Sequence, residues 1–410
     1  MPESALQGAL EARLEAQVQA RTEANREFFA AQAPRLARLC HAMAERFARG
    51  GRLIAFGRTP AARSDARHVA VEFVHPVIVG KRALPAIGLA GEGGPLASQA
   101  QLLAAADDIA IAFGAAEDDG DAARAIAVAR ERGCLTIAFA PAGAEWEFEP
   151  PAGDAYIAQE LVETLYHVLW ELVHVFFEHR GLLAGRTARR THDAGASSFL
   201  YPFLDERESN LDEVLEDVRR SVLMKSDDVG ALREQTLGEN GATLIGAAAA
   251  LRSRFEAGGK LLALGNGGSA TDAMDAVADF RAAVTGGRAW PAIDLTEDPA
   301  ILTAIANDIG TDAIFSRQVI AYGQPGDALL ALSTSGNSSN VIEALAEARR
   351  RGLETIAMVG YDGGRIASHE LADHVVITRS EHIPRIQEAQ ASAYHCLRAL
   401  VDLVAGDQPR

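Results

Sequence analysis

Short runs of apolar residues alternate along the chain with longer segments in which apolar and polar residues recur at helical spacing. Residues 261–264 (Leu-Leu-Ala-Leu) and 328–332 (Ala-Leu-Leu-Ala-Leu) carry no polar side chain and have the length of one strand. Such runs are typical of parallel strands that are buried on both faces. Their alternation with helices predicts an α/β fold with a parallel, doubly wound sheet, in which binding sites lie at the carboxyl ends of the strands.

The same plan occurs twice. Residues 258–265 repeat residues 50–57 almost letter for letter, as Gly-Gly-Lys-Leu-Leu-Ala-Leu-Gly against Gly-Gly-Arg-Leu-Ile-Ala-Phe-Gly. Two further strand candidates follow in each half in the same order, and each half ends in an apolar helix that opens with Gln-Glu, at Gln159 and at Gln387. The chain is therefore an internal duplication of one α/β domain.

Polar and irregular sequence separates the two copies. We expect an N-terminal domain at 1–180, a linker at 181–206 that contains Gly, Ser, Thr and Pro, and a C-terminal domain at 207–410. Helical sequence opens each domain. The first such stretch, residues 4–48, is expected to break near Pro34, because proline lacks the N–H that a helix interior needs.

Composition narrows the class of protein. The 410 residues carry a formal net charge of −17 and the pI is near 5.1, which argues against nucleic acid or an anionic membrane as the main partner. No apolar run reaches transmembrane length and no secretory signal is recognisable, so we expect neither a membrane protein nor a secreted one. The three cysteines are scattered and odd in number, which fits a reducing cytoplasm.

Two loops of the second half are candidate phosphate sites. Residues 333–338 (Ser-Thr-Ser-Gly-Asn-Ser) lie between an expected strand and an expected helix, where free backbone N–H groups and the helix dipole favour an anion. The alternative is an ordinary Ser-rich helix cap, although one cap needs only one hydroxyl. Residues 265–269 (Gly-Asn-Gly-Gly-Ser) follow another expected strand in the same way, and two such loops in one domain are more specific than one.

These motifs resemble those of the sugar isomerase (SIS) domain family, and within it the phosphoheptose isomerases, over roughly residues 208–405. The resemblance rests on the segments 265–269, 302–308 (Leu-Thr-Ala-Ile-Ala-Asn-Asp), 314–318 (Ile-Phe-Ser-Arg-Gln), 333–338 and 385–388 (Arg-Ile-Gln-Glu). It implies two flavodoxin-like, three-layer SIS domains in tandem, and conversion of sedoheptulose 7-phosphate into an aldoheptose 7-phosphate. By the resemblance, the sugar phosphate would be bound by Asn266, Gly267, Gly268, Ser269, Asn307, Asp308, Ser333, Thr334, Ser335, Ser338 and Gln387.

The family also implies a divalent metal, usually zinc, held by a His and a Glu four residues apart and by a Gln and a His eight residues apart. Four and eight residues both return to nearly the same face of a helix. The second half has Asp275 and Asp279 at the first pair and keeps Gln387 and His395 at the second. Because the second half lacks one imidazole, its ligand set is expected to favour zinc less and a harder ion more.

The first half shows the opposite pattern. The whole quartet is present there, as His68, Glu72, Gln159 and His167. The phosphate loops are absent: residues 58–61 read Arg-Thr-Pro-Ala, and 114–119 read Gly-Ala-Ala-Glu-Asp-Asp, whose three acidic side chains would repel a phosphate. The alternative is that the first half is a decayed copy kept for packing.

We therefore hypothesise that the two halves form a pseudo-dimer, with phosphate loops from the second half and a metal from the first half, the second, or both. Aldose–ketose isomerisation through an enediol needs a base and a proton-donating partner. The candidates are Glu72 or Asp279 as base and His167 or His395 as acid or metal ligand, with packing in an apolar helix as the alternative for each histidine.

Two other functions stay open. A non-catalytic, sugar-phosphate-binding regulator has the same fold, because fold alone does not decide activity. An isomerase for a different phosphosugar would also fit. The family forms a homotetramer with sites between subunits, so we expect two of these doubled chains to assemble as a homodimer that imitates it.

Overall fold

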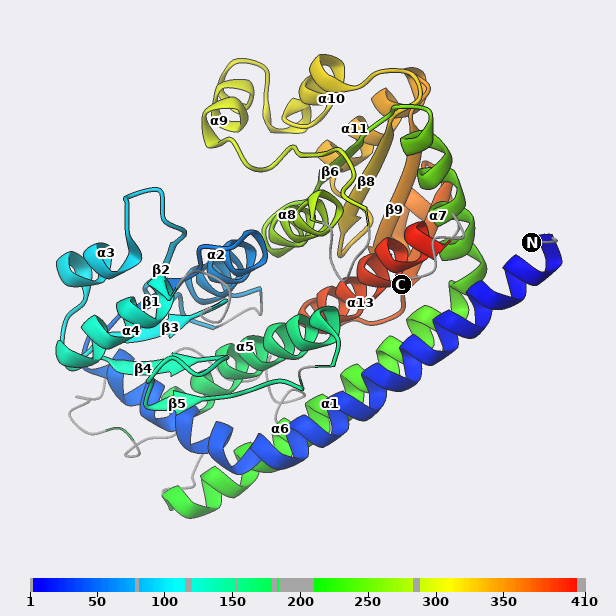
Figure 1. Cartoon of the computed structure of the whole chain (residues 1–410). Helices are drawn as coiled ribbons and strands as arrows, with labels where there is room; N and C mark the ends of the chain where they lie inside the picture. The colour runs from blue at the N-terminus through cyan, green and yellow to red at the C-terminus, as the bar shows by residue number, and fades with distance from the viewer. Residues whose placement is uncertain are drawn as a thin grey trace. The chain divides into compact units, whose positions relative to one another are not determined.

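The computed structural model describes residues 3–77, 81–114, 120–151, 153–178, 183, 210–282 and 288–403 (Figure 1). By its internal contacts the chain divides into two compact units. We call Ala24–Asp228 the N-terminal unit, and Met1–Glu23 together with Val229–Arg410 the C-terminal unit. The expected linker at 181–206 lies outside the described residues except for Leu183, so the domain boundaries stay a prediction.

The N-terminal unit is built on a parallel sheet of five strands in the order β2-β1-β3-β4-β5. The strands are β1 (Leu53–Phe56), β2 (Ala86–Leu89), β3 (Ile109–Ala112), β4 (Leu135–Ala138) and β5 (Trp146–Glu147). The helices are α2 (Pro60–Val74), α3 (Leu96–Leu103), α4 (Asp121–Glu131) and α5 (Ala155–Glu178), with parts of α1 (Glu3–Ala48) and α6 (Leu211–Glu239).

Alternate residues of each strand enter different cores, which makes three layers. In β1, Leu53 and Ala55 pack with α1, α2 and α5, whereas Ile54 and Phe56 pack with α3 and α4. All four are completely buried. This is the reason for the uninterrupted apolar runs of the sequence, because a strand covered by helices on both faces has no polar side.

The C-terminal unit repeats the plan. Its sheet has the order β10-β9-β8-β6-β7, all parallel, with β6 (Leu261–Leu264), β7 (Ala292–Asp294), β8 (Ala328–Ser333), β9 (Glu354–Gly360) and β10 (His374–Thr378). One face is covered by α7 (Gly241–Glu256), α8 (Gly268–Arg281) and α13 (Ile383–Leu403), as Figure 1 shows. The other face carries α10 (Ser316–Tyr322), α11 (Ser339–Arg350) and α12 (Gly364–Ser368), while α9 (Pro299–Asp308) and the 3₁₀ turn η4 (Thr311–Ala313) precede α10.

In order of sequence, both sheets read 2-1-3-4-5, which is the flavodoxin-like arrangement. The prediction of two doubly wound, three-layer domains in tandem is confirmed. In each sheet the strand order reverses beside the first strand, and ligands of such sheets bind at that switch point. The loops that leave β6 and β8 lie there.

Helix α1 differs from its prediction. It runs through Pro34 without a break, from Glu3 to Ala48. A proline inside a helix costs about 3 kcal/mol, because one hydrogen bond is lost. Phe29, Ala33 and Leu36 around it are completely buried in the core of the N-terminal unit. Their burial offsets the cost and keeps the helix continuous.

Candidate functional site

The first candidate phosphate loop leaves β6 and leads directly into α8. Gly267 has φ +57°, and a side chain on it would meet nothing within 4 Å, so the space beside its backbone is open. A Cβ on Gly265 would instead lie 2.1 Å from the backbone oxygen of Ser269, so only glycine fits there. Gly268 opens α8, and Ser269 is buried in its first turn. The start of a helix is a position at which backbone N–H groups bind anions in proteins.

The second loop leaves β8 at Ser333 and enters α11. The Ser333 hydroxyl accepts a hydrogen bond from the N–H of Gly336 at 3.2 Å and lies 3.5 Å from the Ser338 hydroxyl. Gly336 has φ +63°, and a Cβ there would lie 2.2 Å from the backbone oxygen of Gly363. Ser338 precedes α11, yet its side chain makes no capping hydrogen bond. Ser338 therefore does not act as a side-chain cap of α11.

Thr334 and Ser335 complete this turn, and both are half-buried. The backbone oxygen of Thr334 accepts from the N–H of Gly360 at 3.0 Å, and the Ser335 hydroxyl accepts from the N–H of Asn337 at 3.2 Å. The loop is therefore pinned to β9 and held in one shape before any ligand arrives.

A pair of amides joins the two loops. Asn266 and Asn340 each donate a side-chain hydrogen bond to the side-chain oxygen of the other, both at 2.9 Å. Asn266 was predicted from the first loop, but Asn340, in the first turn of α11, was not. This partnership could not be predicted from the sequence, because it depends on how two loops 74 residues apart meet.

The equivalent loops of the N-terminal unit are joined by a salt bridge instead. Arg58 follows β1 and lies 2.6 Å from the Asp121 carboxylate, which also accepts from the N–H of Leu96 at 3.0 Å. Asp121 follows Asp108 by 13 residues, as Asn340 follows Asp327, so the two bridges are equivalent. Burial raises the pKa of Asp121, but the Leu96 N–H and the Arg58 guanidinium outweigh it and hold that pKa below its usual range.

A protein carboxylate thus sits at the helix start where a phosphate would bind. That the first half lacks a phosphate site stays a prediction. The acidic residues 117–119 of this turn lie outside the described residues.

Asn307 and Asp308 lie elsewhere in the C-terminal unit. They end α9, a helix with no buried residue, and both are exposed. The Asn307 amide donates to the Asp308 carboxylate at 2.8 Å. Among the described contacts, none brings either residue to the two loops.

The structure brings Asp275, Asp279 and His395 together, with all ligand atoms within 4.8 Å of one another. Nε2 of His395 lies 3.3 Å from Asp279 and 3.5 Å from Asp275, and the three side chains are buried. Burial raises the pKa of Asp279 to about 6; the Asp275 carboxylate adds to this rise, and the hydrogen bond with His395 opposes it. Gln387 is also buried, two turns before His395 on α13.

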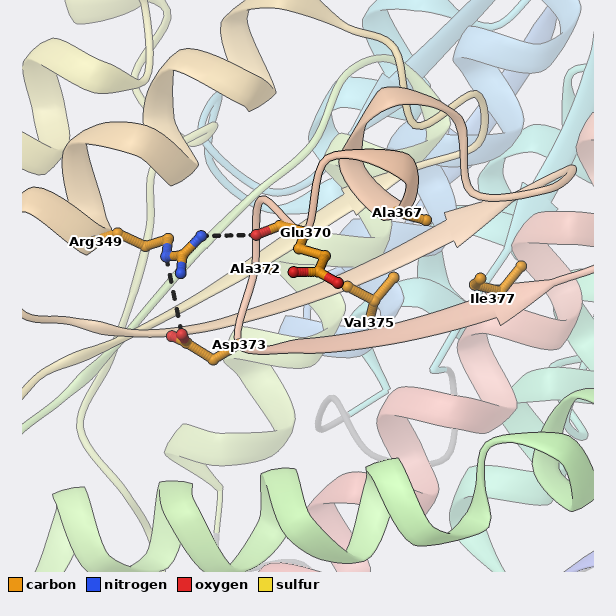
Figure 2. Close-up of a pocket in the computed structure, with 7 residues that line it drawn as sticks. All are labelled: Arg349, Ala367, Glu370, Ala372, Asp373, Val375 and Ile377. Atoms are coloured by element: carbon orange, nitrogen blue, oxygen red, sulfur yellow. Dashed lines mark hydrogen bonds and ion pairs between the residues drawn. The ribbon is translucent and has the colours of Figure 1, made fainter.

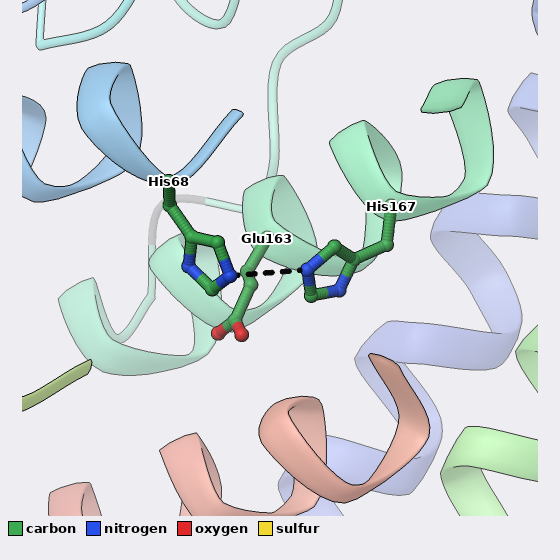
Figure 3. A group of neighbouring side chains, drawn as sticks. All are labelled: His68, Glu163 and His167. Carbon is green, nitrogen blue, oxygen red and sulfur yellow. Dashed lines mark hydrogen bonds between the residues drawn. The ribbon is translucent and has the colours of Figure 1, made fainter. Parts of the chain in front are cut away.

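In the N-terminal unit the compact group is His68, Glu163 and His167 (Figure 3). His68 comes from α2, and the other two come from α5. Nε2 of His68 lies 3.3 Å from Nε2 of His167, and all three side chains are at most 4% exposed. Burial, followed by the charge of His167, holds the pKa of His68 well below its usual range.

Glu72 and Gln159, the other two predicted members of the quartet, are not part of this compact group. A Glu72 carboxylate oxygen lies 3.9 Å from Nε2 of His68, and Gln159 is half-buried near the start of α5. Glu163 was not predicted, although its spacing of four residues from His167 is a helical signal. The family pattern that the other four residues match contains no ligand at this position.

A tyrosine supports each group. The Tyr166 hydroxyl lies 3.0 Å from Nδ1 of His68, and the Tyr394 hydroxyl donates to the Asp275 carboxylate at 2.8 Å. Each tyrosine immediately precedes the histidine of its own group, His167 or His395. Such partners orient ligands around a metal. The donors therefore fit a divalent metal in both units, by type, burial and spacing.

The C-terminal unit also has a cavity of about 460 Å³ that contains none of these residues (Figure 2). Arg349 on its rim donates to the backbone oxygen of Glu370 at 2.7 Å and lies 3.9 Å from Asp373, so its charge is already engaged. The cavity is lined by Arg349, Ala367, Glu370, Ala372, Asp373, Val375 and Ile377.

Bilayer-spanning segments were searched for among the described helices, and none of them combines the necessary length and hydrophobicity.

Known proteins share both the sequence and the fold. The SIS domain family model matches residues 226–360. The phosphoheptose isomerase of Chlorobium phaeobacteroides is 41% identical over 208 residues, which cover 50% of this chain and 87% of that protein. The phosphoheptose isomerase of Synechocystis is 49% identical over 143 residues, covering 35% of this chain and 73% of that protein.

Over nearly the whole chain, this protein resembles solved structures in fold and not in sequence. Tagatose-6-phosphate ketose/aldose isomerase from Escherichia coli superposes with a TM-score of 0.57 and 12% identity, covering 97% of this chain and 93% of that one. A duplicated SIS architecture therefore accounts for both halves. The chain belongs to the SIS domain family and, within it, to the phosphoheptose isomerases, as an isomerase with two SIS domains in tandem.

Proposed function

We propose that the protein is a sugar-phosphate isomerase that interconverts sedoheptulose 7-phosphate and an aldoheptose 7-phosphate. The names of its relatives supply the substrate class. The observation that carries the proposal is the pair of loops joined through Asn266 and Asn340 at the switch point of the C-terminal sheet. Two helix starts, with hydroxyls between them, form a site for a phosphate dianion.

The loops anchor one end of the sugar, which fixes its reacting carbons relative to the protein. Asp279 and His395 are the proposed proton-transfer pair, because their polar atoms lie 3.3 Å apart in a buried setting. The carboxylate removes a proton from the carbon beside the carbonyl, and the imidazole exchanges a proton with the oxygen. Glu72 and His167 are the alternative pair, in the N-terminal unit.

The proposed cofactor is a divalent metal, with zinc as the first candidate. When bound, it would polarise the substrate carbonyl as a Lewis acid. Its ligands would come from His68, Glu72, Gln159 and His167, or from Asp275, Asp279, Gln387 and His395. The second set is richer in oxygen and suits a harder ion than zinc.

We also propose a cytoplasmic location, since the three cysteines are buried and free.

The test is turnover of sedoheptulose 7-phosphate followed by proton NMR in deuterated solvent, with zinc added and with metal chelated. We expect an aldose 7-phosphate that carries solvent deuterium, and a lower rate after chelation. Asp279→Asn should lower kcat by about 100-fold or more, within the range of general acid–base catalysis. Glu343→Gln, which removes an exposed carboxylate from α11, is the matched control and should leave the rate unchanged.

A second function has one observation in its favour. Asp275 and Asp279 stand where the family pattern has His and Glu, and a non-catalytic sensor could tolerate that change. Saturable binding of the sugar phosphate without any turnover, in both metal states, would support the sensor and contradict the isomerase.

A further inference from the structure

Glu163 lies where the family pattern has no ligand. It is one turn before His167 on α5, and its side chain is 4% exposed. The equivalent position in the C-terminal unit, four residues after Gln387, is Ala391. The N-terminal copy therefore has an additional buried carboxylate that points toward its two histidines (Figure 3).

The two histidines are spaced as ligands of one ion. Nitrogen ligands about 2.0–2.1 Å from a tetrahedral metal lie roughly 3.3–3.4 Å apart. Nε2 of His68 and Nε2 of His167 lie 3.3 Å apart. A carboxylate oxygen of Glu163 completes the group within 4.8 Å.

Tyr166 sets the orientation of His68. Its hydroxyl is 3.0 Å from Nδ1, so an Nδ1–H that donates to it leaves the lone pair of Nε2 facing His167 and Glu163. Glu72 is more distant, with 3.9 Å between its carboxylate oxygen and Nε2 of His68.

We propose that Glu163 is a metal ligand, and that His68, Glu163 and His167 form a three-ligand site for a divalent transition metal in the N-terminal unit. Two imidazoles and one carboxylate are a donor set used by zinc and by iron(II), and this set leaves coordination positions open. The inference rests on the proposed metal but does not depend on which sugar phosphate is turned over.

Cobalt(II) binding to the full-length protein tests the site without any substrate. Asp275→Asn with Asp279→Asn removes the carboxylates of the other group, so that the visible absorption of bound cobalt reports the N-terminal unit alone. We expect one cobalt per chain in this background. Glu163→Gln should weaken binding by at least tenfold and change the absorption spectrum, because a ligand is lost.

Glu160→Gln is the matched control, since it neutralises another buried carboxylate of α5 that lies outside the group. It should keep both the affinity and the spectrum. Tyr166→Phe should weaken binding by about tenfold, as expected for a residue that orients a ligand. Thermal unfolding of each variant by circular dichroism checks that it is folded.

Three results would overturn the proposal: no cobalt bound in the background protein, an unchanged affinity and spectrum in folded Glu163→Gln, or a loss of cobalt in Glu72→Gln that Glu163→Gln does not share. If Glu163→Gln unfolds, Glu163→Asp replaces it, and an unchanged cobalt spectrum there would equally contradict direct ligation. Failure of the isomerase assay would leave the cobalt result unaffected, so the two proposals are separable.

Discussion

At the scale of single residues, the two copies differ most clearly in the bridge between their loops. The C-terminal unit uses two neutral amides, Asn266 and Asn340, and the N-terminal unit uses Arg58 and Asp121 at the equivalent positions. A neutral bridge leaves the helix start free for an anion. In the N-terminal unit, the Asp121 carboxylate is itself the anion at the helix start.

Asn340→Asp should therefore weaken binding of a sugar phosphate to the C-terminal unit. A carboxylate about 5 Å from a phosphate costs roughly 3 kcal/mol per charge at an effective dielectric constant of about 20. We expect the Kd measured by calorimetry to rise by at least tenfold. Asn340→Ala, which removes the amide pair without adding charge, should have the smaller effect.

Asp121→Asn is the control for this prediction, because it removes a carboxylate from the equivalent place in the N-terminal unit. It should leave phosphate affinity unchanged. Equal Kd values for Asn340→Asp and Asn340→Ala would show that charge at this helix start is unimportant.

The position of a loop in the fold could be predicted where its motif is local, whereas the binding roles of its residues stay a prediction. Residues 265–269 and 333–338 lie at the helix starts where the sequence placed them, because strand, glycine and helix follow one another directly. Prediction failed for Asn340 and Asp121, whose importance depends on a contact between distant loops. Glu163 was missed for another reason, since a pattern borrowed from a family does not show an added ligand.

At the scale of elements, a buried aspartate holds each sheet together at the end opposite the loops. Asp108 accepts from the N–H of Arg52 at 2.8 Å and pairs with its guanidinium, also at 2.8 Å. Asp327 accepts from the N–H of Lys260 at 2.9 Å and pairs with its ammonium group at 2.5 Å. Each aspartate also accepts from the backbone N–H three residues before it. These bonds fix the first and third strands, which flank the switch point.

Asp108→Asn should destabilise the protein by about 2 kcal/mol, because hydrogen bonds to a buried charge are lost. Burial raises the pKa of Asp108, but the Arg52 guanidinium and the N–H donors hold that pKa below its usual range in the folded protein. Its contribution is therefore present above the unfolded pKa of about 3.9 and is lost as the pH falls through the lower folded value.

Urea unfolding at pH 7 and at successively lower pH values down to about 3 measures both effects. We expect the wild type to lose more stability on acidification than Asp108→Asn does, so that the two proteins converge at low pH. A difference that stays constant with pH would contradict the assigned charge. Asp107→Asn, which alters the exposed neighbour that pairs with Arg49, is the control.

The central strands could be predicted from the sequence, whereas β5, β7 and β10 could not. β1, β3, β6, β8 and β9 are runs buried on both faces, so their composition is distinctive. β5 has two residues, β7 has three, and β10 has three half-buried positions among its five, so none has the continuous apolar pattern. In helix α1 the sequence was misleading instead: the tendency of Pro34 to end a helix was overridden by tertiary packing.

At the scale of the whole molecule, the duplication predicts how many chains assemble. The resemblance to the family implies a homotetramer of single domains, and one chain of this protein carries two such domains. We expect a homodimer, measured as twice the chain mass of 43.4 kDa by light scattering. A lone monomer at the working concentration of the enzyme assay would contradict it.

The two fused copies differ in the candidate ligands and loops that they carry. In the described residues, the C-terminal unit keeps the open helix starts and has Asp275 and Asp279 in its acidic group, whereas the N-terminal unit keeps two histidines and gains Glu163. The prediction that one site draws on both halves stays a prediction.

The Arg58–Asp121 bridge resists evolutionary loss, because a single substitution at either residue is costly. The Asp121 side chain is only 4% exposed, so loss of Arg58 alone would leave a buried carboxylate with Arg124, whose guanidinium lies 3.6 Å away, as its remaining cation. Loss of Asp121 alone would remove the carboxylate that accepts a hydrogen bond from the Leu96 N–H. Each single step costs of the order of 1–3 kcal/mol, and only the double change restores a neutral bridge. Selection for stability therefore retains this charged pair in the N-terminal copy against single substitutions.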